Sequence, residues 1–237
     1  MTTSPIHWIE ATVAAIDTET PEVKTVTLKS PQLLPGRAGQ HYELRLTAED
    51  GYQAARLYSG APQGDSSDSL RLTIQKVPDG EVSPYIHDGL KVGDTVEIRG
   101  PFGRFFVWHE ADEQPILLIG GGSGVIPLAS ILQAHKRSGS KVPIHLIYSS
   151  HTFDDIIYKD ALLDNPQVTI TLTSSAPKDW VGATGRVNLE LIQSVIAGYP
   201  SLPTVYVCGM SPFVSAINDA LQSIGIPLSS IKTERFN

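Results

Sequence analysis

The residues best suited to chemistry form a glycine-rich segment near the middle of the chain, Ile116-Leu-Leu-Ile-Gly-Gly-Gly-Ser-Gly-Val-Ile-Pro127. An apolar strand pattern runs into glycines and then into a helix pattern. Gly122 and Gly124 would let the backbone approach a pyrophosphate, and the helix N-terminus would supply N–H groups and a partial positive charge. Pro127 suits the first helical turn, where a missing N–H costs nothing. This order predicts a nucleotide site, with an ordinary tight turn as the alternative.

The same segment departs from the usual dinucleotide fingerprint, because its pattern is GxGxxP where the fingerprint has GxGxxG. A usual NAD site also carries an acidic residue at the end of the second strand, where it binds the ribose hydroxyls. That strand here ends in Ile147-Tyr-Ser-Ser-His151, without a carboxylate. Asp155 follows soon after, but it fits equally well a capping box that opens a helix from Thr152 to about Leu163.

A second group of chemically capable residues is Arg56-Leu-Tyr-Ser59. Arg56 offers a bidentate fork for phosphate. Tyr58 projects from the same strand face and could lie against a flat ring, whereas Ser59 lies on the other face and could donate a hydrogen bond. The alternative is an ordinary strand with an exposed arginine and a half-buried tyrosine.

A third group, Cys208-Gly-Met210, follows an apolar strand and precedes a helix. In a doubly wound sheet, ligands bind at the carboxyl ends of strands. The alternative is a lone cysteine that fills a small core space. No metal site is expected, because the seven histidines lack metal-ligand spacing and one cysteine excludes a four-cysteine site. Ser123 is not expected to be a nucleophile, since Val125 stands where a nucleophile elbow has glycine.

The composition excludes several classes of protein. The 237 residues include 18 basic and 25 acidic side chains, and the net charge of −7 argues against a nucleic-acid binder or a surface tuned to anionic lipid. No apolar run reaches about 18 residues, so no membrane span is expected. The N-terminus lacks the basic and apolar regions of a secretory signal, and cysteine is scarce, so we expect a cytoplasmic protein.

The first half of the chain shows short alternating apolar segments separated by turn residues. Strands are expected at residues 6–16, 23–28, 42–46, 56–59, 70–77 and 95–98, and a short helix at 83–89. Six short strands at this spacing predict an antiparallel barrel or sandwich.

The second half alternates apolar runs with helix patterns. Strands are expected at 116–119, 144–148, 168–172 and 205–208, with helical stripes through Val125, Leu128, Ala129 and Leu132 and through Phe213, Ile217, Leu221 and Ile224. This alternation predicts an α/β doubly wound parallel sheet with helices on both faces. The polar stretch 109–114 is the expected boundary, which gives domains 1–109 and 110–237.

Eight motifs stand in one order along nearly the whole chain and together resemble the ferredoxin–NADP reductase superfamily, in its short bacterial form without a fused iron–sulfur domain. The motifs are Arg56–Ser59, Gly80–Tyr85, Gly93-Asp94, Gly100–Phe105, Gly120–Pro127, Tyr148–Tyr158, Val207–Gly209 and Glu234–Phe236. The resemblance implies an N-terminal six-stranded antiparallel β-barrel that binds FAD and a C-terminal α/β domain that binds NADH or NADPH. It implies an FAD-dependent NAD(P)H oxidoreductase.

The resemblance also implies roles for residues of the flavin site. Arg56 would bind the diphosphate, Tyr58 would stack on the isoalloxazine, and Ser59 would sit by the reactive flavin nitrogen. The other flavin-binding residues implied are Leu57; Thr73, Ile74, Gln75 and Lys76 along the polar edge of the ring; Val82 and Ser83, at a helix start that would hold phosphate oxygens; and Phe236, which would cover the other flavin face.

For the nicotinamide nucleotide, the resemblance implies a second set of residues. Gly121, Gly122, Ser123, Gly124 and Pro127 would hold the pyrophosphate, Ser150 and His151 would lie on the adenosine side, and Cys208, Gly209 and Met210 would border the nicotinamide. The implied catalytic residues are Ser59, Cys208 and Glu234, the last helping to place the hydride donor.

Two departures from the family pattern concern the nicotinamide nucleotide. His151 and Ser174 stand where many relatives have arginines that can meet an adenosine 2′-phosphate, so we expect NADH to be used at least as well as NADPH. Met210 replaces the proline of the familiar Cys-Gly-Pro, which implies a slightly different nicotinamide corner.

The electron acceptor implied by the resemblance is a separate redox protein, such as a ferredoxin or an oxygenase component, because one cysteine leaves the chain without a cluster of its own. One alternative is a flavin reductase that releases free reduced flavin. Another is a non-enzymatic nucleotide-binding subunit of a larger complex.

Overall fold

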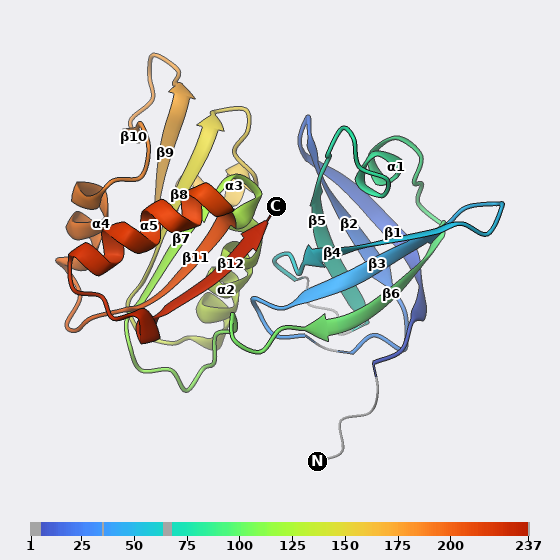
Figure 1. Ribbon diagram of the computed structural model, residues 1–237, viewed down its shortest axis with the longest axis horizontal. Helices are drawn as coiled ribbons and strands as arrows, with labels where there is room; N and C mark the ends of the chain where they lie inside the picture. Colours follow the sequence, from blue (N-terminus) through green and yellow to red (C-terminus); the bar gives the residue numbers. More distant parts are fainter. Residues whose placement is uncertain (1–5, 35, 64–67, 237) are drawn as a thin grey trace. The chain divides into compact units, whose positions relative to one another are not determined.

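The chain divides into two units, residues 1–107 and 108–237, each built on its own six-stranded sheet (Figure 1). The computed structural model describes residues 6–34, 36–63 and 68–236. The expected fold class is confirmed, because the first sheet is antiparallel and the second is parallel with helices. The division between the units falls two residues before the end of the first domain expected from the sequence.

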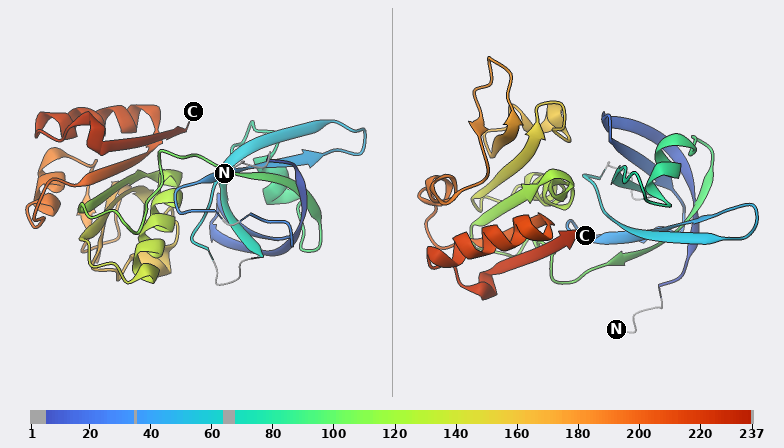
Figure 2. Two further views of the ribbon diagram at one scale, coloured as in Figure 1. Left: turned by 90° about the horizontal axis from the view of Figure 1, so that it is seen from below. Right: turned by 45° about the horizontal axis from the view of Figure 1, so that its top comes forward.

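The first unit is an antiparallel sheet in the order β4-β3-β6-β1-β2-β5. Its strands are β1 (Ile9–Thr20), β2 (Val23–Lys29), β3 (His41–Thr47), β4 (Gln53–Ser59), β5 (Ser69–Gln75) and β6 (Thr95–Phe102). A bridge between Gly60 and Leu72 joins the end of β4 to β5, so the two edge strands meet and the sheet closes as a barrel, as Figure 2 also shows.

Alternating residues of these strands fill the barrel, as a period of two requires. Its fully buried side chains include Leu28, Leu44, Leu72, Ile74 and Ile98. The short helix α1 (Ser83–Asp88) adds Ile86 to the same core, and the flanking residues Val82 and Leu90 join it. Each such side chain contributes about 1.5–3 kcal/mol by leaving water. This core therefore holds β4 and α1, which carry the predicted flavin residues, in one rigid unit.

The second unit is a parallel sheet in the order β10-β9-β8-β7-β11-β12. Its strands are β7 (Ile116–Gly121), β8 (Ile144–Thr152), β9 (Val168–Ser175), β10 (Ala183–Thr184), β11 (Thr204–Met210) and β12 (Ile231–Phe236). The chain leaves β7 toward β8 and later returns to β11 on its other side. The strand order thus reverses between β7 and β11, where ligands bind in folds of this class.

Helices cover both faces of this sheet. The helices are α2 (Val125–Ser138), α3 (Lys159–Leu162), α4 (Leu189–Ile196) and α5 (Ser211–Ser223), with short 3₁₀ turns at Gly122–Gly124 and Leu228–Ser230. Ile192 of α4 and Val214 of α5 pack with Leu117, Ile119 and Val207 on one face. The helix α2 lies on the opposite face (Figure 2). Among the described residues, none of the helices combines the length and apolar character that a membrane crossing needs.

The helix expected from Thr152 to Leu163 is wrong for most of its length, because only Lys159–Leu162 is helical. Asp155 does accept hydrogen bonds from the Thr152 amide and hydroxyl, at 3.0 and 2.6 Å. The Tyr148 hydroxyl, however, accepts from the Ile157 amide and donates to the Asp155 carbonyl. A buried side chain therefore binds the backbone groups that a helix would have paired internally.

Candidate functional site

The glycine-rich segment forms a tight turn from β7 into α2, as its sequence predicts. Gly122 has a φ of +54°, and a Cβ added there would meet nothing within 4 Å. Its backbone is therefore open at the N-terminus of a 14-residue helix, where N–H groups and the helix dipole favour an anion. This cradle fits a dinucleotide pyrophosphate.

Gly124 serves a different purpose from Gly122. A Cβ on Gly124 would lie 2.2 Å from the Cys208 carbonyl oxygen and 2.7 Å from the Gly209 amide nitrogen. The turn is therefore packed directly against the backbone of β11. The glycine at this position is required by packing, whether or not a ligand is bound.

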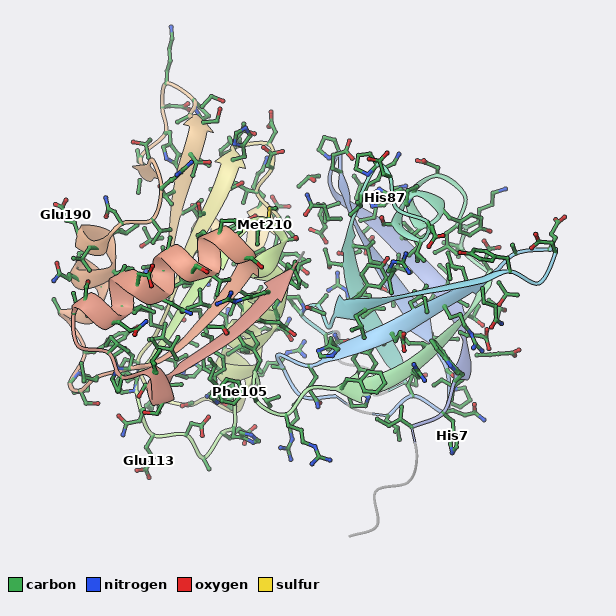
Figure 3. All side chains as sticks on the ribbon, viewed as in Figure 1. His7, His87, Phe105, Glu113, Glu190 and Met210 are labelled. Atoms are coloured by element: carbon green, nitrogen blue, oxygen red, sulfur yellow. The ribbon has the colours of Figure 1, made fainter. Side chains whose placement is uncertain are left out.

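Phe213, at the start of α5, covers the two glycine-containing strand ends. A Cβ on Gly121 would lie 3.1 Å from its ring, and one on Gly209 would lie 2.9 Å from it. The sequence identified Phe213 only as part of a helical stripe. Its contact with both strand ends at the switch point was missed, since nothing local in the sequence links it to Gly121. Figure 3 shows Met210 at the end of β11, close to the start of α5.

Cys208 lies near the carboxyl end of β11 and is completely buried. The strand register places it opposite Gly120 of β7 and opposite Glu234 of β12. Burial, and secondly the charge of Glu234, raise the pKa of the Cys208 thiol well above its ordinary value. The thiol is therefore neutral at physiological pH and is unsuited to act as a nucleophile. Phe236 lies opposite Met210 at the end of the same strand pair.

The end of β8 carries the residues predicted for the adenosine side. Ser150 is buried, and its hydroxyl donates to the Thr152 carbonyl at 3.1 Å. His151 is exposed. Arg186 is also exposed, and it follows Gly185, whose amide donates to the carbonyl of Leu172, within β9, at 2.8 Å. His151 is thus the accessible titratable side chain of β8 itself at this edge.

On the barrel, Arg56 lies on β4 and is not an isolated cation. Its Nη2 donates to Glu81 Oε2 at 2.7 Å, and the Tyr52 hydroxyl donates to the other oxygen of Glu81, also at 2.7 Å. The hydrogen bonds from Tyr52 and then from Arg56 lower the pKa of Glu81, which keeps it ionised. Tyr52 and Glu81 were missed as site residues. Glu81 lies inside the Gly80–Tyr85 motif, but Tyr52 gives no sequence signal.

The residues after Arg56 become more buried toward the end of β4. Leu57 is exposed like Arg56, Tyr58 is half-buried against the barrel core, and Ser59 is buried. Burial raises the pKa of Tyr58 to about 12, so its hydroxyl stays protonated. Tyr58 and Ser59 lie opposite Tyr42 and His41 of β3.

The residues predicted to run along the polar edge of the flavin ring, Thr73 to Lys76, differ in their burial and in their hydrogen-bond partners. Thr73 is buried and shares a hydrogen bond with the Thr25 hydroxyl at 2.7 Å. Ile74 belongs to the core, whereas Gln75 is exposed. Lys76 contacts both oxygens of Asp88, at 2.9 and 3.0 Å. Backbone groups, more than side chains, are therefore what this strand offers to a ring edge.

The start of α1, like the segment from Thr73 to Lys76, offers mainly backbone groups to a ligand. The Val82 side chain is completely buried in the barrel core, so only its main chain can meet a ligand. The Ser83 hydroxyl accepts a hydrogen bond from the Val77 amide at 3.0 Å and retains its proton for donation. A Cβ on Gly80 would lie 3.1 Å from the Val77 carbonyl and 3.2 Å from Ser83 Oγ. This tight turn presents its amides and the Ser83 hydroxyl, and the bond between Glu81 and Arg56 brings the guanidinium to the same turn. This combination of groups fits a phosphate.

The described residues hold no group of three or more histidine, cysteine or acidic side chains that could bind a metal ion. Family models account for most of the chain. The "Oxidoreductase FAD-binding domain" model matches residues 10–107, and the "Oxidoreductase NAD-binding domain" model matches residues 118–219.

Individual relatives agree with these models. The chain is 27% identical to the reductase component of propane 2-monooxygenase from Mycolicibacterium goodii, over 98% of this chain and 68% of the relative. It is 32% identical to NADH-cytochrome b5 reductase 2 from Meyerozyma guilliermondii, over 81% of this chain and 67% of the relative. The crystal structure of a cytochrome P450 reductase from Amycolatopsis matches with a TM-score of 0.81 and 27% identity, covering 100% of this chain and 72% of that one.

The chain belongs to the ferredoxin–NADP reductase superfamily. It is an NAD(P)H-dependent flavoprotein reductase with FAD as its cofactor, in agreement with the resemblance found in the sequence. The chain spans about two thirds of the length of the curated relatives described above.

The contact between Gly124 and β11 predicts a specific destabilisation. Gly124→Ala forces a Cβ against the Cys208 carbonyl, and overpacking of this kind costs about 1–3 kcal/mol. Thermal unfolding should therefore show a lowered midpoint. Gly198→Ala is the matched control, since its new Cβ would be 3.9 Å from the nearest atom. Equal midpoints for the two variants would contradict the packing role of Gly124.

Proposed function

We propose that this reductase passes electrons from NADH or NADPH through FAD to a separate one-electron acceptor protein, of the kind found in multicomponent oxygenase systems. The observation that carries this proposal is that two nucleotide-binding units account for the chain, while a single cysteine leaves these 237 residues without a cluster of their own. The name of the propane monooxygenase relative, a reductase component, supports the same role.

Bound FAD supplies the redox chemistry, since it accepts a hydride and releases electrons singly. The residues of the chain bind and orient. Arg56 and the α1 turn hold the flavin diphosphate, Tyr58 packs on the ring, and the Ser59 hydroxyl donates to the reacting nitrogen. Leu57, Thr73–Lys76, Val82 and Ser83 complete the proposed flavin site on the barrel unit.

The proposed nicotinamide nucleotide site uses the switch point of the second sheet. The backbone of Gly121–Gly124 and the N-terminus of α2, with Pro127 in its first turn, hold the pyrophosphate. Ser150 and His151 lie on the adenosine side, with the buried Ser150 contributing backbone groups. Cys208, Gly209 and Met210 border the nicotinamide. The neutral Cys208 thiol and Glu234 position the ring, and neither needs to form a covalent bond.

A flavin reductase that releases its flavin is the competing function, and retention of FAD distinguishes the two. We expect purified protein to stay yellow through desalting and to bleach on anaerobic titration with NADH. The reduced protein should then reduce a one-electron probe, ferricyanide, without added flavin. Colourless protein whose activity requires added flavin would favour the competing function.

Retention of FAD should depend on Arg56. A hydrogen bond to a charged group contributes roughly 1.5–3 kcal/mol, so Arg56→Ala should weaken FAD binding by about 10- to 150-fold. The dissociation constant can be measured from flavin fluorescence on dilution of the holoprotein. Lys29→Ala, which removes a positive charge from the exposed end of β2, is the control. An unchanged constant in Arg56→Ala would contradict the assignment of Arg56 to the diphosphate.

The choice between nucleotides should follow from the end of β8. A 2′-phosphate calls for an arginine or lysine there, and this position offers an exposed His151. We expect kcat/KM for NADH to equal or exceed that for NADPH at pH 7.5. His151→Arg should shift the ratio toward NADPH by about tenfold, which is about 1.4 kcal/mol.

His7→Arg adds the same side chain to an exposed position of the barrel unit and should leave the ratio unchanged. A preference of the unmodified protein for NADPH above about tenfold would overturn the prediction. Lys178 or Arg186 would then be the phosphate partner.

A further inference from the structure

The guanidinium of Arg56 is held by partners from its own chain. Nη2 donates to Glu81 Oε2 at 2.7 Å, and Nη1 donates to the Ala55 carbonyl at 2.8 Å. Both outer nitrogens therefore already make a hydrogen bond. A diphosphate that uses the fork of Arg56 meets a guanidinium whose charge is balanced by a carboxylate.

Glu81 is fixed in this position from two sides. Its Oε2 accepts from Arg56, and its Oε1 accepts from the Tyr52 hydroxyl at 2.7 Å. Tyr52 lies just before β4, whereas Glu81 precedes α1, so the three side chains connect the hairpin before β4 to the helix turn. The carboxylate is an anchored partner of Arg56 and not a chance surface charge.

The ion pair is about half exposed, with side-chain exposures of 52% for Arg56 and 49% for Glu81. Exposed pairs are weak, so the pair can open at small cost when a stronger anion arrives. A diphosphate is such an anion, since its bonds to arginine are charge-assisted and bidentate. The carboxylate must nevertheless give up Arg56 to that diphosphate, and the cost of breaking this pair is subtracted from the binding of the diphosphate.

Resting on the proposed role of Arg56, we infer that Glu81 is an internal counter-ion that competes with the flavin diphosphate for the Arg56 guanidinium and so lowers the affinity for FAD. Arg56 is thus neutralised in the flavin-free protein, and FAD is bound less tightly than the arginine alone would allow. The opposite role is an orienting one, in which Glu81 holds Arg56 in the geometry that the diphosphate needs.

A double-mutant cycle separates these roles. The proteins are the unmodified chain, Glu81→Gln, Arg56→Ala and the double variant, each prepared with FAD. Release of FAD is followed by flavin fluorescence after dilution, which yields both the dissociation rate and the dissociation constant. Glu81→Gln should bind FAD about three- to tenfold more tightly and release it more slowly. In the Arg56→Ala background the same change should have less than a twofold effect.

The matched control is Glu10→Gln. Glu10 is an exposed carboxylate on β1, three strands from β4 in the order of the same sheet. The Glu10→Gln substitution removes the same charge as Glu81→Gln, and it should change the FAD dissociation rate and dissociation constant by less than twofold. Thermal unfolding verifies that the variants are folded, and Glu81→Ala serves as a second variant if Glu81→Gln does not fold.

Weaker FAD binding in Glu81→Gln would overturn the inference and assign Glu81 the orienting role. Equal tightening with and without Arg56 would also overturn it, because simple repulsion of the diphosphate would then suffice. An unchanged FAD constant in Arg56→Ala is a separate result that overturns the proposed flavin site itself. Each failure is therefore distinguishable from the others.

Discussion

The nucleotide-binding half of this protein depends on the close approach of one turn to one strand. Gly124 lies so near the Cys208 carbonyl that no side chain fits between them. This contact sets where α2 begins relative to β11, and therefore where its N-terminal amides are presented. The adjoining Gly122, open and at a positive φ, can then face a pyrophosphate. Packing and the proposed ligand binding are thus divided between two glycines that are separated only by Ser123.

In the barrel half, the candidate phosphate site is built from charged side chains, whereas in the other half the candidate site is built from closely packed backbone. Its key cation, Arg56, is exposed and paired, and the turn before α1 brings amides and the Ser83 hydroxyl to the same region. In the proposed sites, the two units therefore meet an anion with different surfaces, one made of helix N–H groups and one made of a side-chain charge that is shared with a carboxylate.

Local patterns predicted the six barrel strands, four parallel strands and the helices α1, α2 and α5, because each follows a clear apolar period or turn signal. The last strand, Ile231–Phe236, was missed, since five of its six residues are not buried and its pairing with β11 is long-range. The motifs located Arg56 and Cys208. Arg56 and Glu81 stand 25 residues apart, so only the fold could reveal their contact.

The burial of Cys208 has a consequence for how motion in this protein can be followed. The only thiol in the sequence lies near the carboxyl end of β11, an inner strand of the parallel sheet, and it is shielded from solvent. A thiol-reactive dye can label it only when the structure around the end of β11 opens, locally or by full unfolding. The native chain therefore contains a single-site reporter of sheet opening, without any engineered cysteine. Its labelling rate, divided by the rate for a fully exposed thiol, gives the free energy of opening when reclosing is fast, and comparison with the rate of global unfolding shows whether the opening is local.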